Sequence, residues 1–239
     1  MITNYSPNFS TPSRNINKIK YIIFHYTGMR SQNEAINRLL NVKSKVSCHY
    51  FIKKNGKIIL MVPGNYEAWH AGKSNWKNDK SLNKSSIGIE ISNKGHDHGY
   101  EKFSNNQILS LIKLVKLLIK KYKINKKNIL GHSDISIERK KDPGEKFPWQ
   151  FLSKKGIGIW HNIDPTKLKK LRREKITVSE RSKGIKLLKN IGYFNNKLND
   201  KKHSKLIKSF QRRFRQELVD GIMDLECLII AEKLRKLYK

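Results

Sequence analysis

The chain has 239 residues, which is enough for one large domain or for a medium-sized domain followed by a small one. Its formal net charge of +32 permits an anionic partner, but the lysines are scattered along the chain, so a compositional bias explains much of the excess. The two cysteines, Cys48 and Cys227, exclude a disulfide framework and a cysteine-rich zinc finger.

The start of the chain, MITNYSPNFSTPSRN, lacks the basic and then apolar pattern of a signal peptide. No segment approaches the ~18 uninterrupted apolar residues of a membrane span. We therefore expect no membrane span and a location in the cytoplasm. A periplasmic location is the alternative if a leader has been lost from this chain.

The first part of the chain alternates between strand and helix patterns. Residues 20–28, KYIIFHYTG, are a short apolar run ending in Gly, which is typical of a buried central strand. Residues 33–42, NEAINRLLNV, have apolar side chains at helical spacing. Residues 48–62 contain an Asn-Gly pair between two β-rich runs, which predicts a hairpin. Residues 85–92, SSIGIEIS, alternate strictly and predict another strand.

The pattern continues with a long helix and one more strand. Residues 104–122 have apolar positions at helical spacing, with Ser104 as the expected N-cap. Residues 127–134, KNILGHSD, predict a short strand that leads into a loop. Strands interleaved with helices indicate an α/β domain over residues 1–165.

After a charged stretch, KLKKLRREK, the pattern changes to helices only. We expect a linker over residues 166–178 and a compact three-helix domain over residues 179–239. Its three apolar stripes begin at Ile185, at Leu206 and at Leu225, and Asp224 is the expected N-cap of the third helix.

Eight histidines are present, and four of them are expected outside any site. His96 and His98 lie among Gly, Asn and Asp, which predicts a solvated loop. His161 and His203 have no acidic or histidine neighbour at ligand spacing, and both are expected at the surface. The candidates that remain are His25, His49, His70 and His132.

Two of these histidines lie at strand ends. His25 closes the first apolar strand, and His132 follows the strand predicted before it. Either histidine alone would be interpreted as a hydrogen-bonded residue of the core. Together with one loop carboxylate, however, they would make a three-ligand zinc site with the fourth position open for water. Asp142, which opens an Asp-Pro-Gly turn, is the candidate for the third ligand.

Glu90 lies on the predicted strand at 85–92, on the face opposite its isoleucines. A solvent-facing strand residue is the ordinary explanation for a single Glu. The neighbouring Gly88, though, leaves room for a ligand to approach the sheet.

Five segments closely resemble the type-2 zinc N-acetylmuramoyl-L-alanine amidases, especially the AmiD-like branch: FHYTGM, VSCHYFI, EAWHAGKSNW, LNKSSIGIEISNKGHDHGY and LGHSDISIERKKDPGEKFPW. The resemblance runs in order from about Ser6 to Trp160. Phage lysozyme-type amidases and animal peptidoglycan-recognition proteins share that fold. The helical tail resembles a peptidoglycan-binding domain more loosely, through GYF, SFQRRFRQ and VDGIMD. The resemblance implies a central mixed β-sheet flanked by helices, followed by a small helical domain.

The resemblance also implies roles for single residues. His25, His132 and Asp142 are expected to coordinate one zinc ion, Glu90 to act as the catalytic glutamate and Lys140 as the catalytic lysine. Zinc lowers the pKa of a bound water to ~7, a general base accepts the proton, and a cation stabilises the oxyanion. Each residue type therefore suits its assigned step.

Four further residues are candidates for substrate binding. Trp69, His70 and Asn83 fall in segments that line the muropeptide groove in the family. Arg139 is expected either to bind a carboxylate of the stem peptide or to lie at the surface. His49 lies within the resembling region and is expected to be structural.

The expected activity is hydrolysis of the amide bond between N-acetylmuramic acid and L-alanine, in cell-wall turnover or muropeptide recycling. Peptidoglycan or a muropeptide is the expected partner, and nucleic acid is not expected. The alternatives are a non-catalytic peptidoglycan-recognition protein and nucleic-acid binding through the basic helical tail. The presence of all five expected metal and catalytic residues favours the enzyme.

Overall fold

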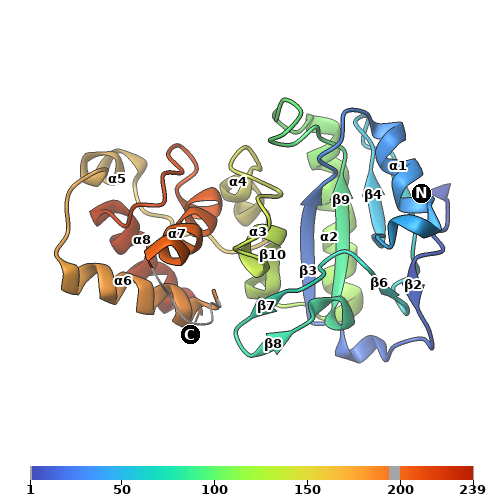
Figure 1. Cartoon of the computed structure of the whole chain (residues 1–239), viewed down its shortest axis with the longest axis horizontal. Coiled ribbons are helices and arrows are strands. Elements are labelled where there is room, and N and C mark those ends of the chain that lie inside the picture. The colour runs from blue at the N-terminus through green and yellow to red at the C-terminus, as the bar shows by residue number, and fades with distance from the viewer. Residues whose placement is uncertain (1, 194–199, 239) are drawn as a thin grey trace.

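The computed structural model describes residues 2–193 and 200–238. Within these ranges a mixed sheet lies at one end of the molecule and a group of helices at the other (Figure 1). The sheet has six strands in the order β1 (Ile2–Thr3), β5 (Ile58–Leu60), β4 (Tyr50–Ile52), β9 (Ser86–Ile91), β3 (Tyr21–Tyr26) and β10 (Ile129–Gly131). Only β4 and β5 pair antiparallel among these neighbours, which confirms the predicted α/β fold with a mixed sheet.

The central strands are buried on both faces. Ile22 and Phe24 of β3 and Ile87 and Ile89 of β9 are inaccessible to solvent. Parallel strands covered on both faces are continuous apolar runs rather than alternating ones. The run YIIFHY therefore predicted β3, although it includes a histidine near its end.

Helix α2 (Asn105–Tyr122) lies behind β3 and β9 in the view of Figure 1. Its apolar face, which includes Leu111, Val115 and Leu118, is buried in the main core. Ser104 accepts a hydrogen bond from the Gln107 amide, and the Gln107 side chain accepts one from the Ser104 amide. The predicted N-cap is thus confirmed, and the reciprocal pair satisfies two amides at the helix start.

Helix α1 (Gln32–Leu40) and the β4–β5 hairpin form a second, smaller core. The hairpin predicted from Asn-Gly is confirmed, because the Lys53 amide donates to the Lys57 carbonyl across the turn. Gly56 has φ of 82°, and a Cβ atom there would come within 2.6 Å of the Asn106 carbonyl oxygen. Both the conformation and the close approach favour glycine.

Several short elements have no clear pattern in the sequence. Strands of two residues form two small ladders, β2 (Phe9–Ser10) with β6 (Glu67–Ala68) and β7 (Asn75–Trp76) with β8 (Asp79–Lys80). The short helices are α3 (His132–Ile135), α4 (Trp149–Lys154) and α5 (Pro165–Leu171), and the 3-10 turns are η1 (Ile16–Lys18), η2 (Val42–Ser44), η3 (Leu82–Ser85) and η4 (Lys126–Asn128).

The C-terminal helices are α6 (Val178–Ile191), α7 (Asp200–Phe214) and α8 (Leu225–Tyr238). Asp224 accepts a hydrogen bond from the Cys227 amide at 2.9 Å, as expected of the N-cap of α8. Phe194 of the GYF segment lies outside the described residues. Within the described ranges, no helix is both long enough and apolar enough to cross a membrane.

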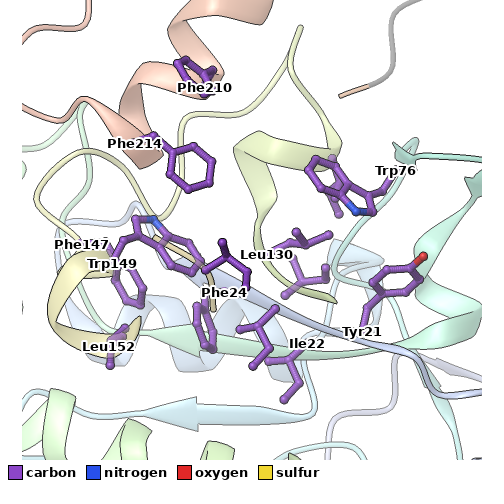
Figure 2. Close-up of a cluster of buried hydrophobic side chains, with 14 of the residues drawn as sticks. Tyr21, Ile22, Phe24, Trp76, Leu130, Phe147, Trp149, Leu152, Phe210 and Phe214 are labelled. Atoms are coloured by element: carbon purple, nitrogen blue, oxygen red, sulfur yellow. The ribbon is translucent and has the colours of Figure 1, made fainter. Parts of the chain in front are cut away.

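One apolar cluster connects the sheet to the C-terminal helices (Figure 2). Trp149 lies 5.5 Å from Phe24 of β3, and Trp160 lies 5.9 Å from Phe214 of α7, measured between ring centroids. Helix α5 overlaps the start of the expected linker and buries Leu168. The domain boundaries at residues 165 and 178 stay a prediction. The apolar packing is continuous across both of them.

Candidate active site

The candidate site lies where β3, β9 and β10 end. The three strands are parallel, so their carboxyl ends meet at one edge of the sheet. His25 is paired with Glu90 across β3 and β9, and His132 follows β10 directly. Asp142 returns to this edge because its carbonyl accepts a hydrogen bond from the Ser133 amide at 2.8 Å.

Three potential metal-ligand atoms converge at this edge. His25 Nδ1 lies 2.9 Å from His132 Nδ1 and 3.1 Å from Asp142 Oδ2, and His132 Nδ1 lies 3.0 Å from the same oxygen. The three residues are only 1%, 3% and 5% exposed. Among the described residues, these three form a cluster of histidines and a carboxylate whose ligand atoms lie close enough together to hold a metal ion.

The hydrogen bonds of the outer ring nitrogens decide which atoms face inward. His132 Nε2 lies 3.1 Å from the Ala71 carbonyl oxygen, which can only accept, so Nε2 carries the proton and Nδ1 presents its lone pair. His25 Nε2 lies 3.0 Å from His70 Nδ1, which lets His25 donate outward in the same way. Two lone pairs and a carboxylate oxygen then point at one another, an arrangement that a cation between them would satisfy.

The protonation states fit such a cation. Burial, together with the neighbouring His132, lowers the pKa of His25 to about 4. Burial acts to raise the pKa of Asp142, but the two imidazoles outweigh it and hold the pKa below its usual range. A neutral imidazole and an ionised carboxylate are the forms that bind metal.

Glu90 lies next to this group and differs from Asp142 in its protonation. Burial raises the pKa of Glu90 well above its ordinary value, the charge of Asp142 raises it further, and Lys140 opposes both. Its Oε2 atom is shielded from solvent and has no hydrogen-bonding partner among the described residues. A carboxyl group with a raised pKa can accept and return a proton near neutral pH.

A cavity of about 370 Å³ opens over these residues. Its lining includes all five residues expected to bind metal or to act in catalysis, His25, Glu90, His132, Lys140 and Asp142. This volume is at the lower end of the ~300–1,000 Å³ typical of ligand sites. The structure therefore brings the five residues together, while their individual roles stay predictions.

The four substrate-binding candidates fall into two groups. Trp69, His70 and Arg139 line the cavity. Asn83 does not line the cavity. Its side-chain oxygen accepts hydrogen bonds from the amides of His70 and Ala71 at 3.1 and 2.7 Å. These contacts indicate that Asn83 shapes the segment beneath the cavity.

His70 has a contact that the sequence pattern did not indicate. It is buried against His25, and a Cβ atom at Gly88 would come within 2.3 Å of its ring. Gly88 thus makes room for the His70 ring against the strand. It does not make room for a ligand there, as the sequence had suggested. The sequence contains no local signal for the contact between His25 and His70, because these two histidines are 45 positions apart.

Two histidines expected in solvent are less exposed than predicted, His161 fully and His96 in part. His161 is buried and lies against Trp160, so its assignment to the surface was wrong. His96 is partly buried, and its ring bonds to the Tyr26 hydroxyl at 2.8 Å and to Glu145 at 3.0 Å. Tertiary packing around aromatic residues places both rings, and neighbouring sequence does not reveal it.

His49 has the contacts of a structural residue. Its Nδ1 accepts a hydrogen bond from the Gly88 amide at 2.9 Å, and its Nε2 lies 2.8 Å from an Arg14 nitrogen. Burial and the Arg14 charge lower the pKa of His49 to about 3, so the ring stays neutral. These bonds join the hairpin to β9 below the cavity.

Comparisons with known proteins agree with this geometry. The family model described as Amidase_2, N-acetylmuramoyl-L-alanine amidase, matches residues 15–145. The N-acetylmuramoyl-L-alanine amidase AmiD of Escherichia coli is 34% identical over 235 residues, which covers 92% of this chain and 84% of the relative.

Solved structures extend the likeness to the C-terminal helices. The E. coli AmiD complex with anhydro-N-acetylmuramic acid-L-Ala-D-gamma-Glu-L-Lys superposes with a TM-score of 0.81 and 33% identity, covering 96% of this chain and 92% of the other. AmpDh3 of Pseudomonas aeruginosa, in complex with anhydromuramic pentapeptide, gives 0.80 and 29%, covering 100% and 99%. The chain belongs to the N-acetylmuramoyl-L-alanine amidase family.

Proposed function

We propose that this protein hydrolyses the amide bond between the lactyl group of N-acetylmuramic acid and L-alanine. The observation that carries the proposal is the convergence of His25, His132 and Asp142 beside Glu90, at the base of one cavity. Membership of the amidase family supports the same reaction.

The metal proposed for this site is zinc. Two imidazole nitrogens and one carboxylate oxygen are a common ligand set for catalytic zinc, which keeps one position open. When bound, zinc would supply a water with a pKa of ~7 and would polarise the carbonyl group to be attacked. The ligand set fits because each inward-facing atom can offer an electron pair.

Glu90 is proposed as the general base and acid. Its carboxylate accepts the proton of the attacking water as the carbon–oxygen bond forms. It then returns the proton to the amide nitrogen as the carbon–nitrogen bond breaks, which releases the amine of L-alanine. The raised pKa of Glu90 suits both steps, since it makes the carboxylate a stronger base toward the water and lets the protonated form persist until the amine leaves.

Lys140 is proposed to stabilise the oxyanion. It lines the cavity two residues before Asp142, and its charge acts on both Glu90 and His25. A cation fixed beside the developing negative charge favours the transition state over the planar amide. Lys141, which also lines the cavity, is half exposed and lies 3.9 Å from the exposed Asp97.

The proposed substrate class is the anhydro-muropeptides. The AmiD structure holds such a molecule with three amino acids, and the AmpDh3 structure holds an anhydromuramic pentapeptide. Both proteins match this chain over more than nine-tenths of its length, including the helical region. Polymeric peptidoglycan is the second substrate to compare.

Product analysis tests the proposal. The purified protein is incubated with a soluble anhydro-muropeptide, with and without prior removal of metal by dipicolinate, and the products are identified by mass spectrometry. The expected products are the free stem peptide and the anhydro sugar, only in the metal-containing sample. An intact substrate in the zinc-supplemented sample would contradict the proposal and would favour a protein that only recognises peptidoglycan.

The compartment in which the reaction takes place remains a prediction. Fractionation of cells that produce the protein, followed by immunoblotting, would test the expected cytoplasmic location. Recovery with the periplasmic fraction would instead favour polymeric peptidoglycan as the natural substrate.

A further inference from the structure

The loop that carries two of the three ligand atoms is covered by the C-terminal helical region. His132 and Asp142 lie at the two ends of this loop, and the Ser133 amide joins them through the Asp142 carbonyl. Helix α7 packs against this loop, and its Arg213 lies over the rings of both Trp149 and Phe214, which Figure 2 labels. The contacts at this junction are polar as well as apolar.

Asp134 is the centre of the polar contacts. It lies two residues after His132, is 1% exposed, and its Oδ2 accepts from the Gly131 amide at 2.8 Å. Arg213 of α7 donates to the same oxygen at 2.6 Å. The Tyr193 hydroxyl donates to Oδ1 at 2.8 Å. Burial and the Asp134 charge raise the pKa of Tyr193 well above its ordinary value, so the phenol stays a donor.

The same helix also binds the backbone on both sides of His132. A second Arg213 nitrogen donates to the Ile129 carbonyl at 2.9 Å, and the Ser209 hydroxyl donates to the Ser133 carbonyl. The Arg213 guanidinium lies 4.3 Å from the centre of the Trp149 ring, which fixes its plane. His132 thus lies between two backbone segments that the helical region holds.

We propose that Arg213 and Tyr193 are positioning residues for the metal centre, and that the helical region sets the metal affinity of the amidase site through Asp134. This inference rests on the proposed function, because it concerns the same ligands. Metal sites need their ligands placed within ~0.5 Å, and groups behind the ligands commonly provide that precision.

Removal of Arg213 would leave a buried carboxylate without its cation close to His132. An unpaired buried charge is costly, so Asp134 would move toward solvent and take the Gly131 turn with it. The expected consequence is a displaced His132 ring in a protein that still has its sheet and its helices.

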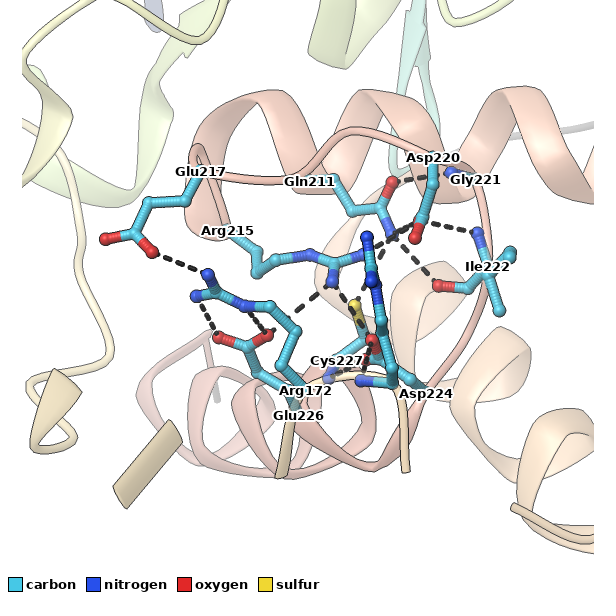
Figure 3. Close-up of polar contacts among 11 residues, drawn as sticks. Arg172, Gln211, Arg215, Glu217, Asp220, Gly221, Ile222, Asp224, Glu226 and Cys227 are labelled. Atoms are coloured by element: carbon cyan, nitrogen blue, oxygen red, sulfur yellow. Dashed lines mark hydrogen bonds and ion pairs between the residues drawn. The ribbon is translucent and has the colours of Figure 1, made fainter. Parts of the chain in front are cut away.

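The helical region contains a matched control in Arg215. Its side chain is 1% exposed like that of Arg213, and it lies two residues further along the chain. Its ion pairs, however, are with Asp220, Asp224 and Glu226 of the helical region itself (Figure 3). A loss that reflects general destabilisation would affect both variants, whereas a positioning role predicts an effect of Arg213 alone.

The experiment compares zinc affinity in the full-length wild type, Arg213→Met and Arg215→Met. Zinc is titrated against a chromophoric chelator, and the absorption spectrum of the Co²⁺-substituted protein reports the ligand geometry. Circular dichroism establishes that each variant is folded at the temperature used. Arg213→Met is expected to bind zinc ~10–100-fold more weakly and to change the Co²⁺ spectrum, while Arg215→Met binds zinc like the wild type.

Two milder variants keep the test decisive if Arg213→Met does not fold. Tyr193→Phe removes only the donor to Oδ1, and Arg213→Lys keeps one cation but loses the bond to the Ile129 carbonyl. Both are expected to weaken zinc binding by less than Arg213→Met.

If folded Arg213 and Tyr193 variants bind zinc like the wild type and keep its Co²⁺ spectrum, the positioning role is refuted, but the proposed function is not. A wild-type protein that binds no zinc would overturn the proposed function as well.

Discussion

Two polar clusters in this protein differ in the groups that pair with their carboxylates. In the helical region, the buried Asp224 and Glu226 and the partly exposed Asp220 each contact Arg172 or Arg215 (Figure 3). At the sheet edge, the ion-pair partners of Asp142 among the described residues are the two imidazoles, whose lone pairs also face each other.

The difference separates a structural cluster from a functional one. The helical cluster contains its own cations, so it is complete without a ligand and stabilises the fold of its region. The cluster at the sheet edge offers electron pairs to a point that no described lysine or arginine occupies, and we propose that an ion from solution completes it. The following predictions test this comparison, from the largest expected effect to the smallest.

Asp142→Ala removes one ligand atom and is expected to abolish zinc binding and amide hydrolysis. The control is Asp224→Ala, which removes an equally buried carboxylate from the helical cluster. This control is expected to lower the melting temperature while zinc content, measured by inductively coupled plasma mass spectrometry, remains near one ion per chain. Zinc loss in the control but not in Asp142→Ala would reverse the assignment of the two clusters.

Glu90→Gln keeps the shape of the side chain but cannot accept a proton. We expect kcat to fall by ~10²–10⁴-fold, because a general base typically contributes that much. The zinc content should not change, since Glu90 is not among the three converging ligands. Near-normal turnover in this variant would refute the role of Glu90 as base.

Lys140→Ala is expected to lower kcat by ~10²–10³-fold at unchanged zinc content, the usual cost of losing one group that stabilises an oxyanion. Lys141→Ala is the matched control, because the two lysines are neighbours and both line the cavity. Equal losses in the two variants would indicate a general effect of positive charge instead of a specific one.

Arg215→Met tests the helical cluster itself. Breaking a buried ion pair typically costs ~3–5 kcal/mol in free energy of unfolding, because the remaining carboxylates lose their cation. Urea denaturation followed by circular dichroism measures this loss, and kcat at a temperature where the variant is folded is expected to stay at the wild-type value. A fall in kcat with unchanged stability would show that this cluster acts on the active site.

Much of the framework could be predicted from sequence. The apolar runs predicted β3 and β9, the Asn-Gly pair predicted the β4–β5 hairpin, and helical spacing predicted α2 with its cap. These features depend on neighbouring residues, and local chemistry is sufficient for them. Strand-end histidines and a turn carboxylate pointed to the metal ligands, the roles of Glu90 and Lys140 were inferred from family resemblance, and the structure places all five candidates around one cavity.

The rest depends on contacts between distant residues. Asp134 has two partners from distant parts of the chain: Tyr193 is 59 positions away and Arg213 is 79 positions away. The two-residue strands are held by one partner strand each, and too few residues take part to leave a pattern. His161 looked like a surface residue because its burial comes from packing of Trp160 and the C-terminal helices.

The central claim is that one zinc ion binds between His25, His132 and Asp142. Crystals grown with zinc and measured on both sides of the zinc absorption edge test it most directly. We predict one strong anomalous peak per chain, bonded to His25 Nδ1, His132 Nδ1 and Asp142 Oδ2 at ~2.0–2.2 Å. No peak at this position, or a peak only at other histidines, would contradict the account.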